Sequence, residues 1–151
     1  MVFWEDIAYN HGPLFAPQAY KEIFGRFYRE VMPLVEQAGI PVRIVDCDGR
    51  IDELIPIWLD WGITTMHPME VAAGMDVVRL RREYGDALSF FGGIDKRILA
   101  TTPEAIRREV LTKLEGVGSG FVVECDHAVP PDVPFANYCY YRKLVREFYE
   151  A

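Results

Sequence analysis

The sequence has no cluster of Lys and Arg, few cysteines and no long apolar run. Its 16 basic and 23 acidic residues give a formal net charge of −7, which argues against nucleic acid or an anionic membrane as partner. No apolar stretch approaches the roughly 18 residues that span a bilayer, so no membrane segment is expected. The start, MVFWEDIAY, lacks the basic and long apolar regions of a secretory signal.

The three cysteines argue against a protein that is held together by disulfide bonds. Cys47, Cys125 and Cys139 are odd in number and form no CxxC motif. Such cysteines are typical of reduced thiols, so we expect a cytoplasmic protein without a disulfide framework. The chain of 151 residues is 50% hydrophobic, which is enough for one domain with a sizeable core.

The sequence does contain segments with the apolar spacing of a strand, and these alternate along the chain with segments that have the apolar spacing of a helix. The predicted strands cover residues 2–9, 42–47, 63–67, 88–93 and 120–125, and the predicted helices cover 17–38, 51–61, 75–85, 103–115 and 134–150. Pro33 is expected to kink the first helix, and Thr102-Pro103 to open the fourth. Five strand–helix units in a row predict an α/β fold with a parallel sheet.

Polar residues capable of chemistry follow every predicted strand. In chain order they are Glu5, Asp6 and Tyr9; Asp46 and Asp48; His67 and Glu70; Asp95 and Lys96; and Asp126 and His127. The turns at the opposite strand ends, such as AGIP and DWGI, carry nothing comparable. Chemistry in α/β sheets and barrels sits at the carboxyl ends of the strands, so the expected site lies among these residues.

Four segments carry a resemblance to a known family: FWEDIAYNHGPLFAP (3–17), VDCDGRI (45–51), FGGIDKRIL (91–99) and DHAVPPDVPFANY (126–138). They resemble the C-terminal part of the uroporphyrinogen decarboxylase superfamily, which also contains corrinoid-dependent methyltransferases. The resemblance implies a single domain, residues 1–151, that matches the C-terminal portion of a TIM (β/α)8 barrel.

A partial barrel raises a packing problem. Five strands cannot close an eight-stranded barrel, because strand number, tilt and shear are linked. The first and last strands would then be open edges beside exposed apolar surface. We therefore expect either a piece of a longer barrel or an oligomer, in its simplest form a homodimer, whose copies cover each other's open sides.

The stretch VDCDGRI carries the expected metal ligands. Asp46 and Asp48 are two apart on a strand, so they share a face while Cys47 takes the other. Zinc methyltransferases of the superfamily have His-x-Cys-Gly at the matching place and a distant Cys. The resemblance puts Asp46, Asp48 and His127 at those three ligand positions.

Two carboxylates and an imidazole suit zinc, or a harder divalent ion such as manganese or iron. Glu70 is a candidate fourth ligand, or a first-turn carboxylate favoured by a helix dipole. As an alternative without a metal, Asp46 and Asp48 cap the helix predicted from Ile51.

Three functions stay open. The first is methyl transfer between a small substrate and a corrinoid on a partner protein, at a metal centre. Its expected catalytic residues are Asp6, Glu70 and His127, where the family match selects Asp6 over its neighbour on the strand. The expected substrate-binding residues are Tyr9, Asp95, Lys96 and Asp126.

The second function is a decarboxylase-type lyase of porphyrin biosynthesis. The decarboxylases also have His at the position of His127, but their active-site Ser falls on Asp6, and their Arg-rich N-terminal loop has no counterpart here. The third is a non-catalytic barrel fragment with a partial site.

Overall fold

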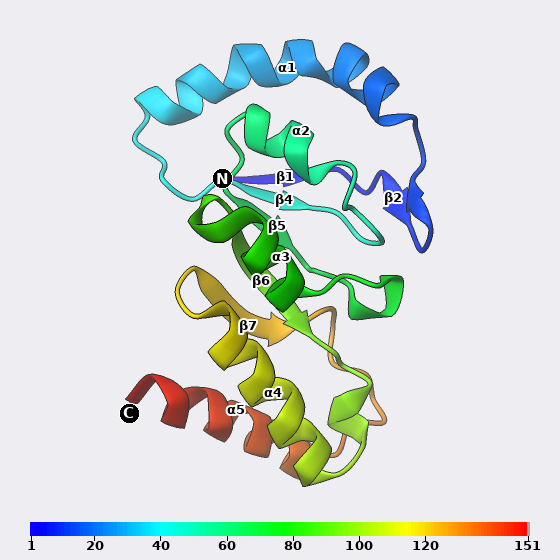
Figure 1. Ribbon diagram of the computed structural model, residues 1–151, viewed down its shortest axis with the longest axis vertical. Coiled ribbons are helices and arrows are strands. Elements are labelled where there is room, and N and C mark those ends of the chain that lie inside the picture. The colour runs from blue at the N-terminus through cyan, green and yellow to red at the C-terminus, as the bar shows by residue number, and fades with distance from the viewer. Residues whose placement is uncertain (151) are drawn as a thin grey trace.

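The computed structural model describes residues 1–150, which form five parallel strands covered by helices (Figure 1). The main sheet has the order β1 (Val2–Trp4), β4 (Ile44–Asp46), β5 (Thr65–His67), β6 (Ser89–Ile94) and β7 (Phe121–Cys125). The helices are α1 (Pro17–Gln37), α2 (Ile55–Asp60), α3 (Val77–Tyr84), α4 (Pro103–Val117) and α5 (Phe135–Glu150). Short 3-10 turns are η1 (Val71–Ala73), η2 (Gly85–Ala87) and η3 (Ile98–Ala100). Strand order follows chain order, which confirms the predicted α/β fold and is consistent with part of a TIM barrel.

One row of side chains across the sheet forms the centre of the core. Phe3, Val45, Met66, Phe90 and Phe121 are paired in register from β1 to β7, and all five are buried. Because side chains alternate along a strand, the next row points to the opposite face of the sheet. The register that builds the core therefore also decides which residues reach that other face.

The long helix α1 packs an aromatic surface against the rest of the domain. Tyr20 and Tyr28 are fully buried, and both donate hydrogen bonds to the Glu5 carboxylate, at 2.9 and 2.5 Å. Burial and this carboxylate raise the pKa of both phenols, so they stay protonated donors. The Trp58 indole donates to the Tyr20 hydroxyl at 3.0 Å, which ties α2 to the same cluster.

The apolar stripe of α1 is wider than the surface that the domain covers. Ile23 and Leu34 are 66% and 63% exposed, and Phe27 is also exposed. The helix continues through Pro33 to Gln37. No helix within residues 1–150 has both the length and the hydrophobicity needed to cross a membrane.

Two predicted elements differ from the observed ones. The strand predicted over residues 2–9 stops at Trp4, because Asp6 adopts a left-handed φ of 40°, and the chain continues into the hairpin β2 (Ala8–Tyr9) and β3 (Gly12–Pro13). The helix predicted over residues 51–61 begins only at Ile55, after a turn. Its N-cap is Leu54, so the interpretation of Asp46 and Asp48 as caps is wrong.

The two edge strands of the sheet, β7 and β1, differ in what contacts their outer backbone groups. At β7, the hydroxyl of Tyr141 donates to the carbonyl of Val123 at 2.9 Å, and the hydroxyl of Tyr149 donates to that of Phe121 at 3.2 Å. Side chains of α5 thus occupy edge carbonyls that another strand would otherwise use. At the opposite edge, β1 pairs only with β4 within the described residues.

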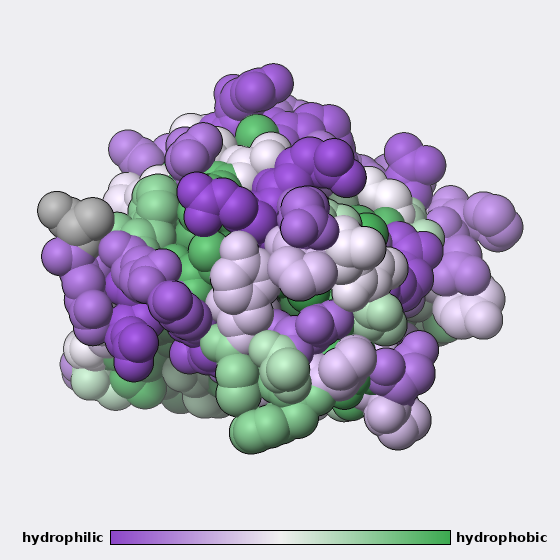
Figure 2. Space-filling model, turned by 90° about the horizontal axis from the view of Figure 1, so that it is seen from below, coloured by the Kyte–Doolittle hydropathy of each residue, from purple (hydrophilic) through white to green (hydrophobic). Residues whose placement is uncertain are grey.

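The end of the molecule below α5 is mostly polar. Figure 2 shows hydrophilic side chains over most of this face, with hydrophobic side chains gathered along its lower edge. This distribution agrees with an α5 that packs one face on the domain and turns charged residues outward.

We predict that Tyr141→Phe lowers the free energy of unfolding by about 1 kcal/mol, because the buried carbonyl of Val123 then keeps only its longer contact, at 3.4 Å, with the Arg142 guanidinium. Tyr149→Phe is expected to cost less than about 0.5 kcal/mol, since Tyr149 is exposed and water can replace its hydroxyl. Urea unfolding of both variants measures the difference. Equal costs would mean that Tyr141 does not satisfy the β7 edge.

Candidate functional site

A cavity of about 520 Å³ lies at the carboxyl ends of the strands, on the face of the sheet away from the helices. Its lining is Trp4, Asp6, Asp46, Asp48, His67, Pro68, Glu124, Cys125, His127 and Ala128. A neighbouring hollow of about 580 Å³ shares three of these residues and is also lined by Tyr9 and Glu70. The structure therefore brings together six of the predicted site residues.

Alternation along β4 and its following loop aims the two aspartates at the cavity. Val45 and Cys47 are buried in the core, whereas Asp46 and Asp48 line the cavity on the opposite face, as the spacing predicted. Burial raises the pKa of the Cys47 thiol to about 12, so it is an inert core side chain.

Asp6 joins the two aspartates from the loop after β1. Its left-handed backbone turns Glu5 toward α1 and Asp6 toward the cavity. The resemblance in sequence likewise selects Asp6 over Glu5 as the residue that faces the site. One carboxylate oxygen each from Asp6, Asp46 and Asp48 lies within 4.8 Å of the others. Oxygen atoms from three carboxylates at this separation could hold a divalent cation.

Two imidazoles complete the polar lining. His67 Nδ1 lies 3.0 Å from Asp46 Oδ2, and His127 Nε2 lies 3.2 Å from Asp48 Oδ2. Asp46 and Asp48 therefore each have one histidine partner, His67 at the end of β5 and His127 in the loop after β7.

Charge crowding acts on Asp48 in particular. Burial raises its pKa first; the attraction of His127 opposes this, and repulsion from Asp6, Glu70 and Asp46 adds to the rise. A carboxylate in this setting gains from any cation that lies between it and its neighbours.

The second ring nitrogen of His127 is also engaged. Nδ1 lies 2.6 Å from the carbonyl of Asp126, and a carbonyl accepts only from a protonated nitrogen. With that proton in place, Nε2 either carries a second proton and pairs with Asp48, or presents a lone pair to a cation. The geometry thus provides one nitrogen ligand beside the carboxylates.

Glu70 lies behind Asp48 rather than inside the cluster of three carboxylates. Its Oε2 accepts the N–H of Gly49 at 2.9 Å. Gly49 has a φ of 86°, and an added Cβ would lie 2.7 Å from the backbone N and Cα of Tyr9. Only glycine fits there, so the peptide that follows Asp48 is held tightly.

Three predicted substrate-binding residues lie apart from the cavity lining. Asp126 is fully buried and accepts the N–H groups of Val71 and Lys96 at 2.9 and 3.2 Å. Lys96 Nζ lies 3.5 Å from the same carboxylate. Asp95 is buried and pairs with Arg97 at 2.7 Å; although burial raises its pKa, the hydrogen bonds and charge of Arg97 lower it below the usual value. The prediction that these residues bind substrate is untested, and their contacts are with the chain itself.

Sequence reasoning missed several lining residues. The sequence does not mark Trp4, Glu124 or Cys125 as site residues, and it marks His67 only by its place at a strand end. The register could have found two of them, because Trp4 and His67 are the partners of Asp46 on the neighbouring strands. Burial raises the pKa of Cys125 to about 11, so its thiol is protonated at neutral pH.

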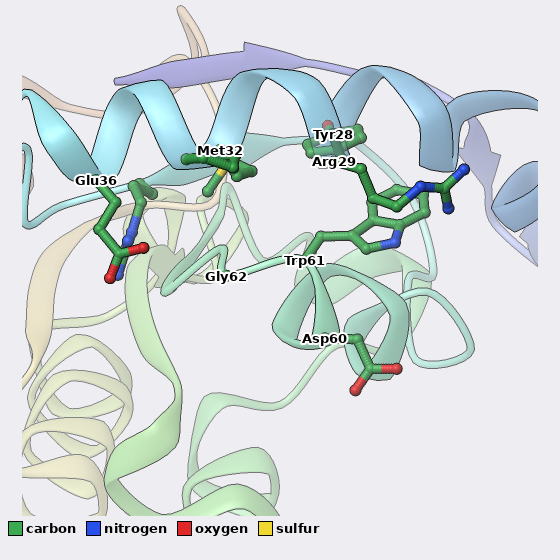
Figure 3. A pocket seen from close by; sticks show the side chains of 9 residues that line it. Tyr28, Arg29, Met32, Glu36, Asp60, Trp61 and Gly62 are labelled. Carbon is green, nitrogen blue, oxygen red and sulfur yellow. The ribbon is translucent and has the colours of Figure 1, made fainter.

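A second cavity, of about 270 Å³, lies between α1 and the end of α2 (Figure 3). Figure 3 shows Arg29, Glu36 and Asp60 pointing away from one another around Trp61 and Met32. Binding sites concentrate a few convergent polar groups, and these three charged side chains do not converge. The cavity at the strand ends is therefore the better candidate site.

Comparison with known proteins gives a consistent family. The family model described as Uroporphyrinogen decarboxylase (URO-D) matches residues 1–148. The uroporphyrinogen decarboxylase of Legionella pneumophila (strain Corby) is 28% identical over 141 residues, which cover 90% of this chain and 38% of that protein. The uroporphyrinogen decarboxylase of Pseudoalteromonas translucida is 35% identical over 94 residues, 61% of this chain and 23% of that protein.

Among solved structures, a methyltransferase from Methanosarcina mazei has a TM-score of 0.68 at 16% identity, over 98% of this chain and 42% of that chain. At this identity the likeness establishes the fold alone. The chain thus spans about two-fifths of the length of the Legionella relative and of the solved methyltransferase.

We predict that Asp48→Asn, measured with a chelator present, raises the free energy of unfolding at pH 7. Because the pKa of Asp48 is raised, its ionised form costs native stability as pH rises above the ordinary pKa of an aspartate, and the variant removes that cost. In this partly exposed position the gain is at most about 1 kcal/mol. The difference between variant and parent should vanish near pH 3, where both are neutral.

The matched control is Asp86→Asn, because the Asp86 side chain is 96% exposed. Denaturant unfolding across pH measures both. A loss of stability in Asp48→Asn at pH 7 would contradict the crowding of carboxylates.

Proposed function

The chain belongs to the uroporphyrinogen decarboxylase family, and from that premise we propose that it binds a divalent metal ion and transfers a methyl group between a small substrate and a corrinoid. The observation that carries the proposal is the convergence of Asp6, Asp46 and Asp48 within 4.8 Å, with His127 against Asp48. The corrinoid would reside on a partner protein, and the cavity of about 520 Å³ would receive the small substrate.

The donor set fits a metal ion. Carboxylate oxygens and one imidazole nitrogen are ligands of zinc, manganese and iron, whereas a thiolate site would need ionised cysteine. We assign Asp46, Asp48 and His127 as ligands. A bound divalent ion would act as a Lewis acid on a substrate oxygen or sulfur.

Other residues would support that ion or the substrate. His67 Nδ1, at 3.0 Å from Asp46, orients that carboxylate. Asp6 adds negative charge to the cluster and is the candidate proton acceptor from a substrate thiol or hydroxyl. Tyr9 lines the adjacent hollow, where it would contact the substrate.

A decarboxylase-type lyase is the second candidate, favoured by the names of the Legionella and Pseudoalteromonas relatives. The charge of the cavity opposes it. Four of the lining residues are acidic, and the lining within residues 1–150 includes no Lys or Arg. A porphyrin precursor rich in carboxylates would be repelled from such a cavity.

We predict that the purified protein binds about one divalent ion per chain, and that Asp48→Ala or His127→Ala lowers the affinity at least about 100-fold, because each removes a ligand. Isothermal titration with zinc and with manganese measures this, after chelator treatment. Asp86→Ala and His11→Ala, at exposed positions, are the matched controls.

Full binding by both ligand variants would overturn the ligand assignment. A parent protein that binds no ion would leave the lyase or a non-catalytic barrel fragment as the function.

We also propose a homodimer formed on the side of β1 and α1. Exposed apolar residues gather on α1: Ile23, Phe27 and Leu34. Such a surface on a single chain is typical of a protein interface. Within residues 1–150, β1 pairs only with β4, whereas side chains of α5 contact the other edge of the sheet.

We predict that the double substitution Ile23→Glu and Leu34→Glu converts the dimer into a monomer without unfolding it, because both side chains are exposed within one chain. Light scattering gives the mass, and circular dichroism checks the fold. Arg26→Glu, at an exposed polar position of the same helix, is the control. A parent protein that is monomeric at high concentration would exclude this interface.

A further inference from the structure

Two carboxylates behind the cavity bind backbone amides of other loops. Asp126 Oδ2 accepts the N–H of Val71 at 2.9 Å. Glu70, the residue before Val71, accepts the N–H of Gly49 through Oε2 at 2.9 Å. The loop after β7 therefore holds the loop after β5, and that loop holds the one after β4.

These loop contacts form a closed cycle that passes through Asp48 and His127. Gly49 follows Asp48, and Asp48 Oδ2 lies 3.2 Å from Nε2 of His127. His127 in turn follows Asp126, where the first contact began. The residue pairs 126–127, 70–71 and 48–49 thus form one closed ring, hereafter the loop ring.

We infer that Glu70 and Asp126 are positioning residues, which fix the loops that carry Asp48 and His127 and are not ligands of the ion. The ion in this inference rests on the proposed function, but the loop ring does not. This assignment differs from the sequence prediction, which made Glu70 catalytic and Asp126 a substrate contact.

The burial of Asp126 supports the inference. Its exposed fraction is 0%, so no ligand in the cavity can reach it. Its other oxygen accepts the N–H of Lys96 at 3.2 Å, which adds the loop after β6 to the same anchor. The ammonium of Lys96, 3.5 Å away, balances the buried charge.

The setting of Gly49 makes Glu70 effective. The peptide between Asp48 and Gly49 cannot shift toward Tyr9, because the Tyr9 backbone already lies against the Gly49 Cα. A hydrogen bond to a charged carboxylate then holds it from the other side. Losing that bond would free the Asp48 backbone, although Asp48 itself is unchanged.

The decisive test compares Glu70→Gln with Glu70→Ala. A glutamine carbonyl can still accept the Gly49 N–H, so we expect zinc affinity within about threefold of the parent, whereas alanine should lose about 10–100-fold. Titration of the chelator-treated protein with zinc gives both values. Equal losses in the two variants would make Glu70 a ligand and overturn the inference.

Hydrogen exchange of the metal-free protein tests whether a change at Asp126 reaches Gly49 through the loop ring. In Asp126→Asn the side chain loses its charge and one of its two acceptor oxygens, which weakens its hold on the amides of Val71 and Lys96, and we expect hydrogen exchange of the Gly49 amide to rise about tenfold. Tyr141→Phe removes a comparable buried hydrogen bond elsewhere, and should leave the Gly49 amide unchanged. Unchanged exchange in Asp126→Asn would overturn the coupling.

These two measurements separate the proposals. Faster Gly49 exchange in a protein that binds no zinc supports the loop ring and rejects the metal centre. If Asp126→Asn does not fold, the comparison of Glu70→Gln with Glu70→Ala decides the inference by itself, through zinc affinity and Gly49 exchange.

Discussion

The pairing of β4 with β1 on one side and β5 on the other is the constraint on which the site depends. The pairing places Trp4, Asp46 and His67 in one row on the open face, and Phe3, Val45 and Met66 in the buried row before it. A slip of β4 by one residue would put the Asp46 carboxylate into the aromatic and aliphatic core. Hydrophobic burial therefore sets the position of the polar groups as firmly as that of the core.

Much of the fold could be predicted because it depends on local patterns. Alternation in VDCDG correctly separated Val45 and Cys47 from Asp46 and Asp48, and Thr102 caps α4 as expected, accepting the N–H of Ala105. The rule that chemistry follows parallel strands also brought Asp6 and His127 to the same cavity. These features need no knowledge of how distant loops meet.

The remaining features depend on contacts between loops, which one sequence does not encode in any local pattern. Nothing near Asp126 indicates that its partners are the amides of Val71 and Lys96. The break of the first strand arises at Asp6, whose left-handed backbone sends Glu5 to two tyrosines of α1. A residue type at a strand end thus predicts where a side chain lies more reliably than what it binds.

The covering of β7 by Tyr141 and Tyr149 has a consequence for how copies of the chain can assemble. Two free edges of different kinds would allow head-to-tail addition without limit, as in a growing fibre. Within the part of the chain that the structure describes, helix α5 covers the β7 edge, so edge pairing between two copies would join β1 to β1. Among residues 1–150, a β1-to-β1 pairing would use the edge of both copies, and the hydroxyl groups of α5 would keep further copies from adding at β7.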